Sequence, residues 1–536
     1  MRHLTPPAPH RRAREVWLGI VTGLAVLALA STAHALRAAR TGGGPADNWG
    51  LPGLTTQWPV YGGNAWQDRF SPIASLSPAN ASRLRPAFTT PLPSQGQGQG
   101  QESGPIEVGG RIYLATPGGG VVAIDAATGA LIWTRPGPGR SPTRGVAVDG
   151  NRLFVLDSNN ALVALDAATG HELWTAPVYR GGAPPGAFTS TAPIVADGMV
   201  LVGVAGGDNG VRGFVEAMSA EDGRLLWRFY TVPAPGQGWV PATGSHGGGA
   251  VWTPVTVDPA SGVVYVATGN PSPDFYGVHR PGSDPYTDGV VALDVHSGKL
   301  LWYGQEVPHD LWDYDAASPP VLFPLPGGGL GVGEAGKSGY WFEWNAATGH
   351  ALTAPLAFVR EDHTAPTPQG TLEWPGTWGG ANYGPSAYDP ATGLAYVAGI
   401  NLPQIVRGVA TPHQAGAPDF GTSMGNAPGA QATGTLTAID VRTGRMRWQV
   451  ALASPAFGGV TVTSGGLLLF GTVDGRVEAL DARTGARLWS ASVGANIGAP
   501  PIAYVDGGRT YVAVASGGSE MGGAPRIDQV VVWTVG

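Results

Sequence analysis

One phrase recurs along the chain and limits its fold more than any other feature: Asp, two residues, Thr or Ser, Gly, three residues and Trp. Full copies begin at Asp125, Asp166, Asp294, Asp440 and Asp481, and weaker copies begin at Ser219 and Asn345. Repetition at roughly 40 to 50 residues, with short apolar segments before the copies, is typical of a β-propeller. The Asp-to-Gly part predicts a turn. We expect the Trp to fill the seam between one blade and the next.

The seven phrases and the apolar C-terminal segment QVVVWTVG from Gln529 predict about eight blades. A terminal strand of this kind can pair with a strand from the N-terminal region, which closes the ring and removes an exposed edge. Single blades cannot bury their faces alone. The sequence therefore predicts one all-β, eight-bladed propeller over residues 49–536.

The first 48 residues have a different character. Arginines within residues 11–14 precede an apolar run from Val16 to Ala30, and Ala33–Ala35 resembles a small-x-small cleavage site. The run is about 15 residues long, whereas a spanning helix needs about 20. This favours a cleaved export signal over an uncleaved membrane anchor, with residues 41–48 as a linker. In either case we expect the propeller in the periplasm or another extracytoplasmic location.

The composition argues against several functions. Charged residues make up only 13% of the chain, the net charge is -7, and no basic stripe exists, so nucleic acid is not an expected partner. The chain has no cysteine, which excludes disulfides, thiolate zinc sites and covalently attached c-type haem. A redox enzyme built on this chain must therefore pass electrons to a separate protein or a lipid-soluble carrier.

A long segment, residues 401–434, separates two of the phrases and has little periodicity. Loops longer than about 15 residues are usually functional or disordered. The segment is either a lid over the central axis or a surface insertion, and the sequence leaves both open.

The densest polar cluster is QEVPHDLWDYD, which holds Asp310, Asp313 and Asp315. In extended geometry, side chains two residues apart face the same way. Asp313 and Asp315 can then converge on a calcium-like cation, or one of them can act as a general base. The alternative is that these are turn-forming aspartates with main-chain hydrogen bonds.

Other candidates lie in glycine-rich or apolar contexts. Asp208 follows Gly206 and Gly207, where the backbone can approach a ligand closely. Asn270 can supply a neutral oxygen ligand, or it is an ordinary turn residue.

Three further side chains suit a planar anionic ligand. Trp252 can stack on such a ligand, although a Trp in a blade seam is the commoner case. Arg144 and Lys337 are isolated cations that suit ligand carboxylates, or they are surface charges.

These stretches resemble the pyrroloquinoline quinone (PQQ)-dependent dehydrogenases, the eight-bladed quinoprotein alcohol and sugar dehydrogenases. The resemblance runs from Trp58 to Gly518 and is most specific in VYVATGNPSPD, VPHDLWDYD and WGGANYGPSAYDPATGLAYV. It implies that Asp313 is the catalytic base that takes the alcohol proton, and that Trp252 stacks under the quinone. The implied cofactor-binding positions are Glu102, Arg144, Ser190, Gly206, Gly207, Trp252, Lys337 and Asn382. The implied metal ligands are Asp208, Asn270, Asp313 and Asp315.

The chain departs from the family pattern in ways that bear on the cofactor. It lacks the adjacent cysteine pair of many relatives, as sugar-oxidising members also do. Asp208 stands where many relatives have Glu, and Ala205 and Ala250 stand where relatives often have hydroxyls. Two lost hydrogen bonds at about 1 kcal/mol each would weaken cofactor binding roughly thirtyfold. Asp315 resembles the extra carboxylate of lanthanide-using members, but sugar-oxidising relatives that use calcium or magnesium share it.

The resemblance implies an exported PQQ- and metal-dependent oxidoreductase, with calcium or a lanthanide as the metal. Its substrate would be an alcohol, polyol or sugar hydroxyl, and its acceptor a separate cytochrome c or a membrane quinone. The alternative is a non-catalytic propeller that scaffolds the cell envelope. Such a scaffold has no reason to keep Asp313, Asn270, Trp252, Glu102 and Lys337 together, so their joint presence favours the enzyme.

Overall fold

A computed structural model describes residues 55–93, 100–139, 143–240, 247–518 and 525–536, all within a compact unit, Asn48–Gly536. The predicted export signal or anchor and its whole linker, residues 41–48, lie outside the described residues. Helices in the described ranges are short 3-10 turns: η1 (Ala81–Arg83), η2 (Gly207–Asn209) and η3 (Gly277–His279). None of them is long and apolar enough to span a membrane.

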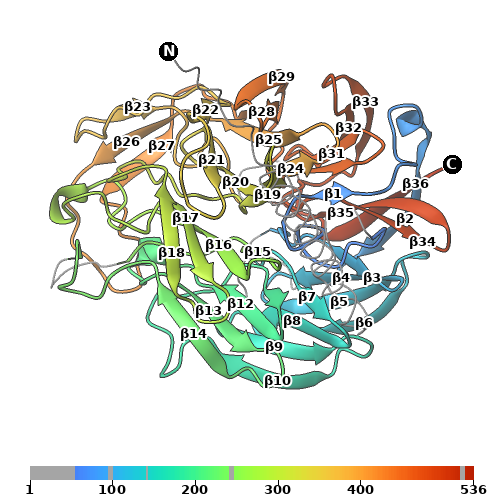
Figure 1. The fold of residues 1–536 in the computed structure, drawn as a ribbon, viewed down its shortest axis with the longest axis horizontal. Helices are drawn as coiled ribbons and strands as arrows, with labels where there is room; N and C mark the ends of the chain where they lie inside the picture. The colour runs from blue at the N-terminus through green and yellow to red at the C-terminus, as the bar shows by residue number, and fades with distance from the viewer. Residues whose placement is uncertain (1–54, 94–99, 140–142, 241–246, 519–524) are drawn as a thin grey trace, which may run out of the picture. The chain divides into compact units, whose positions relative to one another are not determined.

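Eight of the nine sheets in the described residues are blades that follow one another around a ring (Figure 1). The first blade contains β3 (Ile106–Val108), β4 (Arg111–Thr116), β5 (Gly120–Asp125) and β6 (Leu131–Arg135). The second contains β7 (Ala147–Asp149), β8 (Arg152–Leu156), β9 (Ala161–Asp166) and β10 (Glu172–Pro177). The third contains β11 (Ile194–Ala196), β12 (Met199–Gly203), β13 (Phe214–Ser219) and β14 (Leu225–Tyr230).

The ring continues with four-stranded antiparallel blades. The fourth contains β15 (Thr256–Asp258), β16 (Val263–Thr268), β17 (Gly289–Asp294) and β18 (Leu300–Gln305). The fifth contains β19 (Val321–Pro324), β20 (Leu330–Ala335), β21 (Tyr340–Asn345) and β22 (Leu356–Ala357). The sixth contains β24 (Ala387–Asp389), β25 (Leu394–Asn401), β28 (Thr433–Asp440) and β29 (Arg445–Leu452).

The last two blades join the ends of the described chain. The seventh contains β30 (Val460–Thr463), β31 (Leu467–Gly471), β32 (Arg476–Asp481) and β33 (Arg487–Ser492), and β1 (Phe70–Ser71) pairs parallel to β30. The eighth contains β34 (Ile502–Asp506), β35 (Arg509–Ser516), β36 (Gln529–Val535) and β2 (Leu84–Pro91). β2 pairs with β36 from Leu84 opposite Val535 to Pro91 opposite Gln529. The predicted composite blade and the eight-bladed fold are therefore confirmed.

The repeated phrase works as a turn followed by a seam residue. In the first copy, Asp125 Oδ1 accepts hydrogen bonds from the backbone N–H and the hydroxyl of Thr128 at 2.8 and 2.7 Å. The Trp that ends the phrase then reaches the next blade, as Trp227 Nε1 does to the carbonyl of Val295 at 2.8 Å. Equivalent bonds run from Trp133 to Ala167, Trp302 to Ala346 and Trp448 to Ala482.

In five of the seven phrases the Gly makes room for the Trp ring of the preceding phrase. A Cβ on Gly298, whose φ is +66°, would overlap the Trp227 ring. Glycine therefore meets two needs at this position, the left-handed backbone conformation and the close approach of the ring. The predicted role of the Trp residues in the seams is confirmed.

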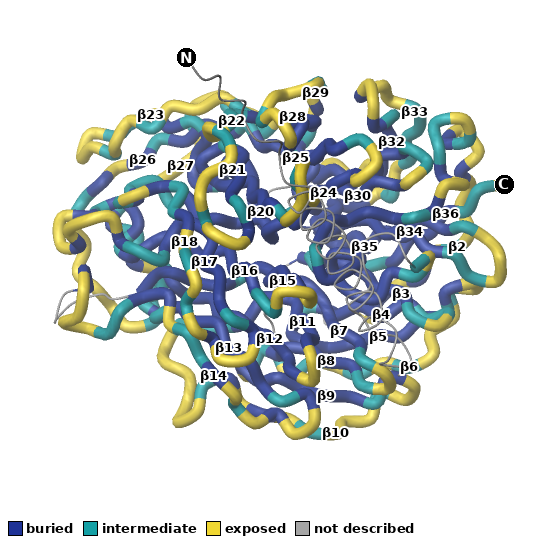
Figure 2. The backbone as a smooth tube through the Cα atoms, viewed as in Figure 1, coloured by how far each residue is buried: buried dark blue, intermediate teal, exposed yellow. Residues whose placement is uncertain are grey.

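Burial increases from the rim of the ring toward its centre (Figure 2). All residues of β11 and β12 are buried, whereas the outer strand β6 is mostly exposed. First strands of neighbouring blades contact one another, as β7 contacts β11 and β15 contacts β19. Because the first strands contact one another, the loops that lead into them are the segments that meet near the axis.

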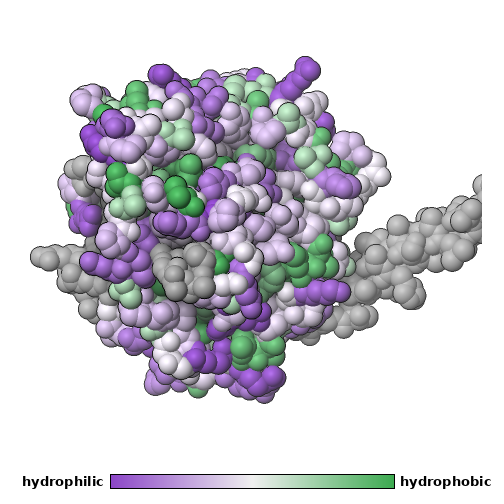
Figure 3. Space-filling model, turned by 90° about the vertical axis from the view of Figure 1, so that its left-hand side faces the viewer, coloured by the Kyte–Doolittle hydropathy of each residue, from purple (hydrophilic) through white to green (hydrophobic). Residues whose placement is uncertain are grey.

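On the face drawn in Figure 3, hydrophobic residues form small groups among hydrophilic ones.

The ninth sheet is formed by strands that the sequence did not indicate. It contains β23 (Thr371–Glu373), β26 (Gln404–Gly408) and β27 (Thr422–Asn426). Two of these strands come from the segment 401–434, which therefore holds regular structure. The turn between them, residues 409–421, returns toward the ring and is called the strap below.

Candidate active site

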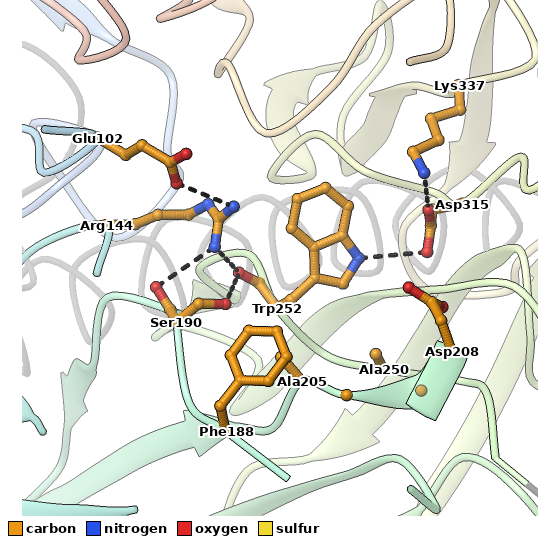
Figure 4. Close-up of a pocket in the computed structure, with 12 residues that line it drawn as sticks. Glu102, Arg144, Phe188, Ser190, Ala205, Asp208, Ala250, Trp252, Asp315 and Lys337 are labelled. Carbon is orange, nitrogen blue, oxygen red and sulfur yellow. Dashed lines mark hydrogen bonds and ion pairs between the residues drawn. The ribbon is translucent and has the colours of Figure 1, made fainter. Parts of the chain in front are cut away.

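The candidate site lies in the loops that precede the first strands of five successive blades. Its residues Glu102, Arg144, Ser190, Trp252 and Asp315 stand three to six positions before β3, β7, β11, β15 and β19, respectively. Together with Phe188, Ala205, Gly206, Gly207, Asp208, Ala250 and Lys337 they line a cavity of about 260 Å³ (Figure 4). The loops before the innermost strands therefore collect residues that are far apart in the sequence.

Arg144 organises one side of this cavity. Its Nη2 lies 3.2 Å from Glu102 Oε2, and its Nη1 donates to the carbonyl of Trp252 at 3.1 Å. Its guanidinium carbon lies 4.7 Å from the Trp252 ring centroid and 4.5 Å from that of Tyr383. Ser190 closes this side, because its hydroxyl donates to the same Trp252 carbonyl at 3.4 Å. A fixed, largely buried cation thus stands beside the indole.

Lys337 organises the opposite side. Its Nζ lies 2.8 Å from Asp313 Oδ1 and 2.5 Å from Asp315 Oδ2. Asp315 Oδ1 also accepts a hydrogen bond from Trp252 Nε1 at 3.2 Å, so this carboxylate links the ammonium to the indole (Figure 4). Gly269 makes room for it, since a Cβ there would overlap Asp315 Oδ1. Trp252 therefore lies between two cationic groups, Arg144 and Lys337.

The three aspartates of the HDLWDYD segment have different roles. Asp310 is a turn residue, whose carboxylate accepts the backbone N–H groups of Trp312 and Tyr314 at 3.1 and 3.0 Å. Asp313 and Asp315 do converge, on Lys337. The expected cause was wrong, however, because the segment is not extended: Asp313 has a left-handed backbone with φ of +62°. This conformation is uncommon for a residue other than glycine and is often found at functional sites.

Asp208 and Asn270 belong with Asp313 and Asp315 to the polar side of the site, which is called the floor below. Asp208 belongs to η2, directly after Gly206 and Gly207, and Gly206 has a left-handed φ of +92°. The backbone N–H of Asn270 donates to Asp315 Oδ1 at 3.1 Å. The side-chain amide of Asn270 donates to the carbonyl of Pro271 at 3.3 Å, and Asn270 lowers the pKa of Asp208.

The electrostatics of this floor are dominated by burial and by repulsion between carboxylates. Burial, and then the charge of Asp315, raise the pKa of Asp208 to about 6. Burial also raises the pKa of Asp313 well above its ordinary value, although Lys337 opposes this effect. Burial opposes the charge of Lys337, but Asp313 and Asp315 outweigh it and raise the pKa of the ammonium. Burial therefore favours the neutral acids at Asp208 and Asp313, and Lys337 is the group that opposes this effect.

Three predicted residues are not among those that line the cavity: Asn270, Asp313 and Asn382. The amide of Asn382 donates to the carbonyl of Trp378 at 3.0 Å and accepts the N–H of Tyr383 at 2.9 Å, so its hydrogen bonds lie within its own loop. Its contact with the cofactor remains a prediction. Conversely, sequence reasoning missed Phe188 and Tyr383, which line or adjoin the site. Phe188 and Tyr383 stand close in sequence to predicted residues, in the loops before first strands. Considering every residue of those loops would therefore have identified them.

The strap lies against this floor. The backbone N–H of Asp419 donates to the carbonyl of Asp208 at 2.6 Å, and the N–H of Phe275 donates to the carbonyl of Phe420 at 2.9 Å. His413 packs at Gly210, where a Cβ would come within 2.7 Å of its ring. No residue of the segment 401–434 lines the cavity, so the choice between a lid and a surface insertion remains a prediction.

The cavity fits a flat, polycarboxylated quinone. An indole face lies between two cations, and Arg144 Nε near it is a buried donor without a partner among the described residues. The floor supplies carboxylate and amide oxygens, which are the ligands of hard cations. No three His, Asp or Glu side chains of the described ranges already form a metal centre, and Lys337 lies between Asp313 and Asp315.

Comparison with known proteins assigns the class. The family model "PQQ: Glucose/ethanol/alcohol dehydrogenase, beta-propeller domain" matches residues 58–361 and 355–512. The quinohemoprotein alcohol dehydrogenase of Comamonas testosteroni is 32% identical over 525 residues, which cover 86% of this chain and 73% of that protein.

Solved structures agree with this assignment. A crystal structure of the Comamonas testosteroni enzyme has a TM-score of 0.81 at 29% identity and covers 90% of this chain and 81% of that one. A europium-containing methanol dehydrogenase has a TM-score of 0.79 at 26% identity, with coverage of 89% and 98%. The chain belongs to the PQQ-dependent dehydrogenase family, and it is an oxidoreductase that acts on CH–OH groups.

Proposed function

We propose that this protein is an exported dehydrogenase that binds PQQ against Trp252 and a cation at Asp208, Asn270, Asp313 and Asp315. Its substrate is an alcohol, a polyol or a sugar, and its electrons go to a separate cytochrome c or a membrane quinone. The observation that carries the proposal is the placement of Trp252 between Arg144 and Lys337, with Asp313 and Asp315 on the same ammonium.

Each side chain of the site has a definite task in this reaction. When bound, PQQ supplies the electron acceptor and the cation supplies Lewis acidity. Arg144 and Lys337 bind carboxylate or carbonyl oxygens of a flat ligand, and Trp252 fixes its plane. Asp313 accepts the proton of the substrate hydroxyl at a carboxylate oxygen. The strap, which is bonded to Asp208, limits access of water to this floor.

Two features of the sequence support the route of the electrons and the location. The chain has no cysteine with which to attach haem, so the next acceptor is a separate molecule. The arginines before the apolar run Val16–Ala30 have the pattern of an export signal. The segment HDLWDYDAASPPVL is slightly more similar to sugar- and polyol-oxidising relatives, so these compounds belong in the substrate panel.

The proposal is tested by reconstitution. The purified protein is incubated with PQQ and either calcium or lanthanum, and dye reduction is followed against a panel of alcohols, polyols and sugars. We expect activity that requires both PQQ and a cation and that falls at least a thousandfold in Asp313→Asn. The matched control is Asp197→Asn, an exposed aspartate that should leave the rate unchanged. Absence of PQQ binding with either ion would overturn the proposal.

A further inference from the structure

The turns and strand ends of the last three blades concentrate arginine. The repeated phrase needs its Asp, Gly and Trp for the fold, whereas the positions between them are free to vary. The residue two positions after the first is Ala, Ala, Glu, His and Ala in the first five phrases, and it is Arg442 and Arg483 in the last two. With their neighbours these make a set of exposed arginines, called the arginine face below: Arg83, Arg85, Arg442, Arg445, Arg447, Arg483, Arg487 and Arg509.

The arginine face lies at the end of the propeller opposite the candidate site. The site residues precede the first strand of each blade, and successive strands are antiparallel, so the turns after the first and third strands lie at the far end. Arg445 begins β29 and Arg487 begins β33 after such turns, and Arg509 begins β35. Arg83 and Arg85 stand at the start of β2, which is the fourth strand of its blade. β29, β33 and β2 follow one another around the ring (Figure 1).

Contacts between neighbouring blades make this surface continuous. Trp448 of β29 donates from Nε1 to the carbonyl of Ala482 at 3.1 Å, which places the sixth blade against the turn that carries Arg483. η1, which ends at Arg83, packs against β33 of the seventh blade. The arginines of three blades therefore belong to one surface.

The carboxylates of these blades do not neutralise the arginine face toward solvent. Arg442 pairs with Asp440 at 3.1 Å and Arg487 pairs with Glu478 at 3.0 Å, and both carboxylates are largely buried. The other six arginines form no ion pair among the described residues. The aspartates at the same turns are buried or half-buried: Asp389, Asp440, Asp481 and Asp506. Positive charge therefore dominates what this surface presents to solvent.

The N-terminal segment is attached at this same end. The described residues begin at Thr55, and the carbonyl of Thr56 accepts the N–H of Val505 at 2.9 Å. Val505 stands near the end of β34, four residues before Arg509. Thr55, through which residues 1–54 join the propeller, therefore lies beside the arginine face.

We propose that the arginine face binds the surface of a membrane that contains anionic lipids, with the candidate site directed away from the membrane. An arginine near such a surface strengthens binding about fivefold. Stable attachment takes two signals, such as an apolar segment and a basic patch. The apolar run Val16–Ala30 belongs to the segment attached beside this face, which favours a lipid surface over an acidic protein as the partner. The arginine face orients the protein if the run is retained and holds it reversibly if the run is cleaved.

The test measures the preference for anionic over neutral vesicles. The purified protein is sedimented with vesicles of phosphatidylcholine alone and with vesicles of equal parts phosphatidylcholine and phosphatidylglycerol. The ratio of the two affinities isolates the effect of charge, because apolar contacts contribute to both. We expect a ratio of at least about a hundred at low salt, and a fall toward one at high salt, where charges are screened.

Matched double variants locate the effect. Arg445→Gln with Arg483→Gln removes two arginines that form no ion pair, and it should lower the ratio roughly 25-fold. Arg224→Gln with Lys299→Gln is the control. Arg224 and Lys299 are exposed and take the position of Arg445 in two earlier phrases, outside the arginine face. The control should change the ratio less than about twofold. Equal melting temperatures of both variants and the wild-type protein verify that these turn substitutions leave the fold intact.

Two results would overturn the inference. Equal affinity of the wild-type protein for neutral and anionic vesicles would leave an acidic protein, rather than a membrane, as the partner of the arginine face. An equal loss in the two double variants would show that the net distribution of charge, and not this surface, sets the preference. Neither result bears on the cofactor site, which the reconstitution with PQQ tests separately.

Discussion

Replacing Lys337 with Met should destabilise the cation-free protein and strengthen its binding of cations. The ammonium is the counter-ion of two carboxylates, at 2.8 Å from Asp313 and 2.5 Å from Asp315, and its side chain is only 9% exposed. Met keeps most of the aliphatic stem but removes the charge. Breaking a buried ion pair from one side costs about 3–5 kcal/mol, because the other partner stays buried without compensation.

That free energy corresponds to a measurable shift in melting temperature. At about 2.1 cal/mol/K per residue, the roughly 490 residues of Asn48–Gly536 unfold with an entropy of about 1 kcal/mol/K. Lys337→Met should therefore lower Tm by about 3–5 °C in calorimetry without added cation. With saturating calcium or lanthanum the deficit should shrink, because the ion replaces the lost positive charge.

The matched control is Lys299→Met, which removes the only other lysine of the chain from an exposed turn. It should leave Tm and cation affinity unchanged. An unaltered Tm in Lys337→Met without cation, or a weaker affinity for cations, would refute the reasoning about the charge balance of the floor.

Four further substitutions follow from the surroundings of particular residues. Gly269→Ala places a Cβ against Asp315 Oδ1 and should weaken lanthanum binding at least tenfold, with unchanged affinity as the contrary result. Ala205→Ser and Ala250→Ser restore hydroxyls at the cavity wall, and each should tighten PQQ binding about fivefold in a spectroscopic titration. Burial, and then the charge of Asp310, raise the pKa of the Glu373 carboxyl to about 9. The unfolded chain loses this proton near pH 4.5, so the protonated carboxyl stabilises the fold fully below about pH 4.5, and this stabilisation is lost as the pH rises through 9. Glu373→Gln should therefore flatten the fall in Tm between pH 5 and pH 9, whereas parallel profiles would contradict it.

The architecture was predictable because its determinants are local and repeated. The Asp and Gly of each phrase set a turn by themselves, and the Trp fills a seam that every neighbouring pair of blades shares. The composite blade followed from one apolar segment at the C-terminus, since an unpaired edge strand needs a partner. The ninth sheet was not predictable in this way, because β23 and β26 pair across an interval with no repeat.

The site was only partly predictable, because its chemistry depends on contacts between distant loops. Asp313 and Asp315 were expected to converge through extended geometry, whereas a left-handed turn at Asp313 and the ammonium of Lys337 bring them together. Asp310 has the same residue type in the same segment but only satisfies backbone N–H groups.

The most direct test of the account is a crystal structure of the protein reconstituted with PQQ and lanthanum. The account predicts PQQ flat against Trp252, with carboxylate or carbonyl oxygens at Arg144 and Lys337. It also predicts lanthanum bound by oxygens of Asp208, Asn270, Asp313 and Asp315. A structure in which the quinone binds elsewhere, or in which Lys337 keeps both aspartates and no ion is held, would contradict it.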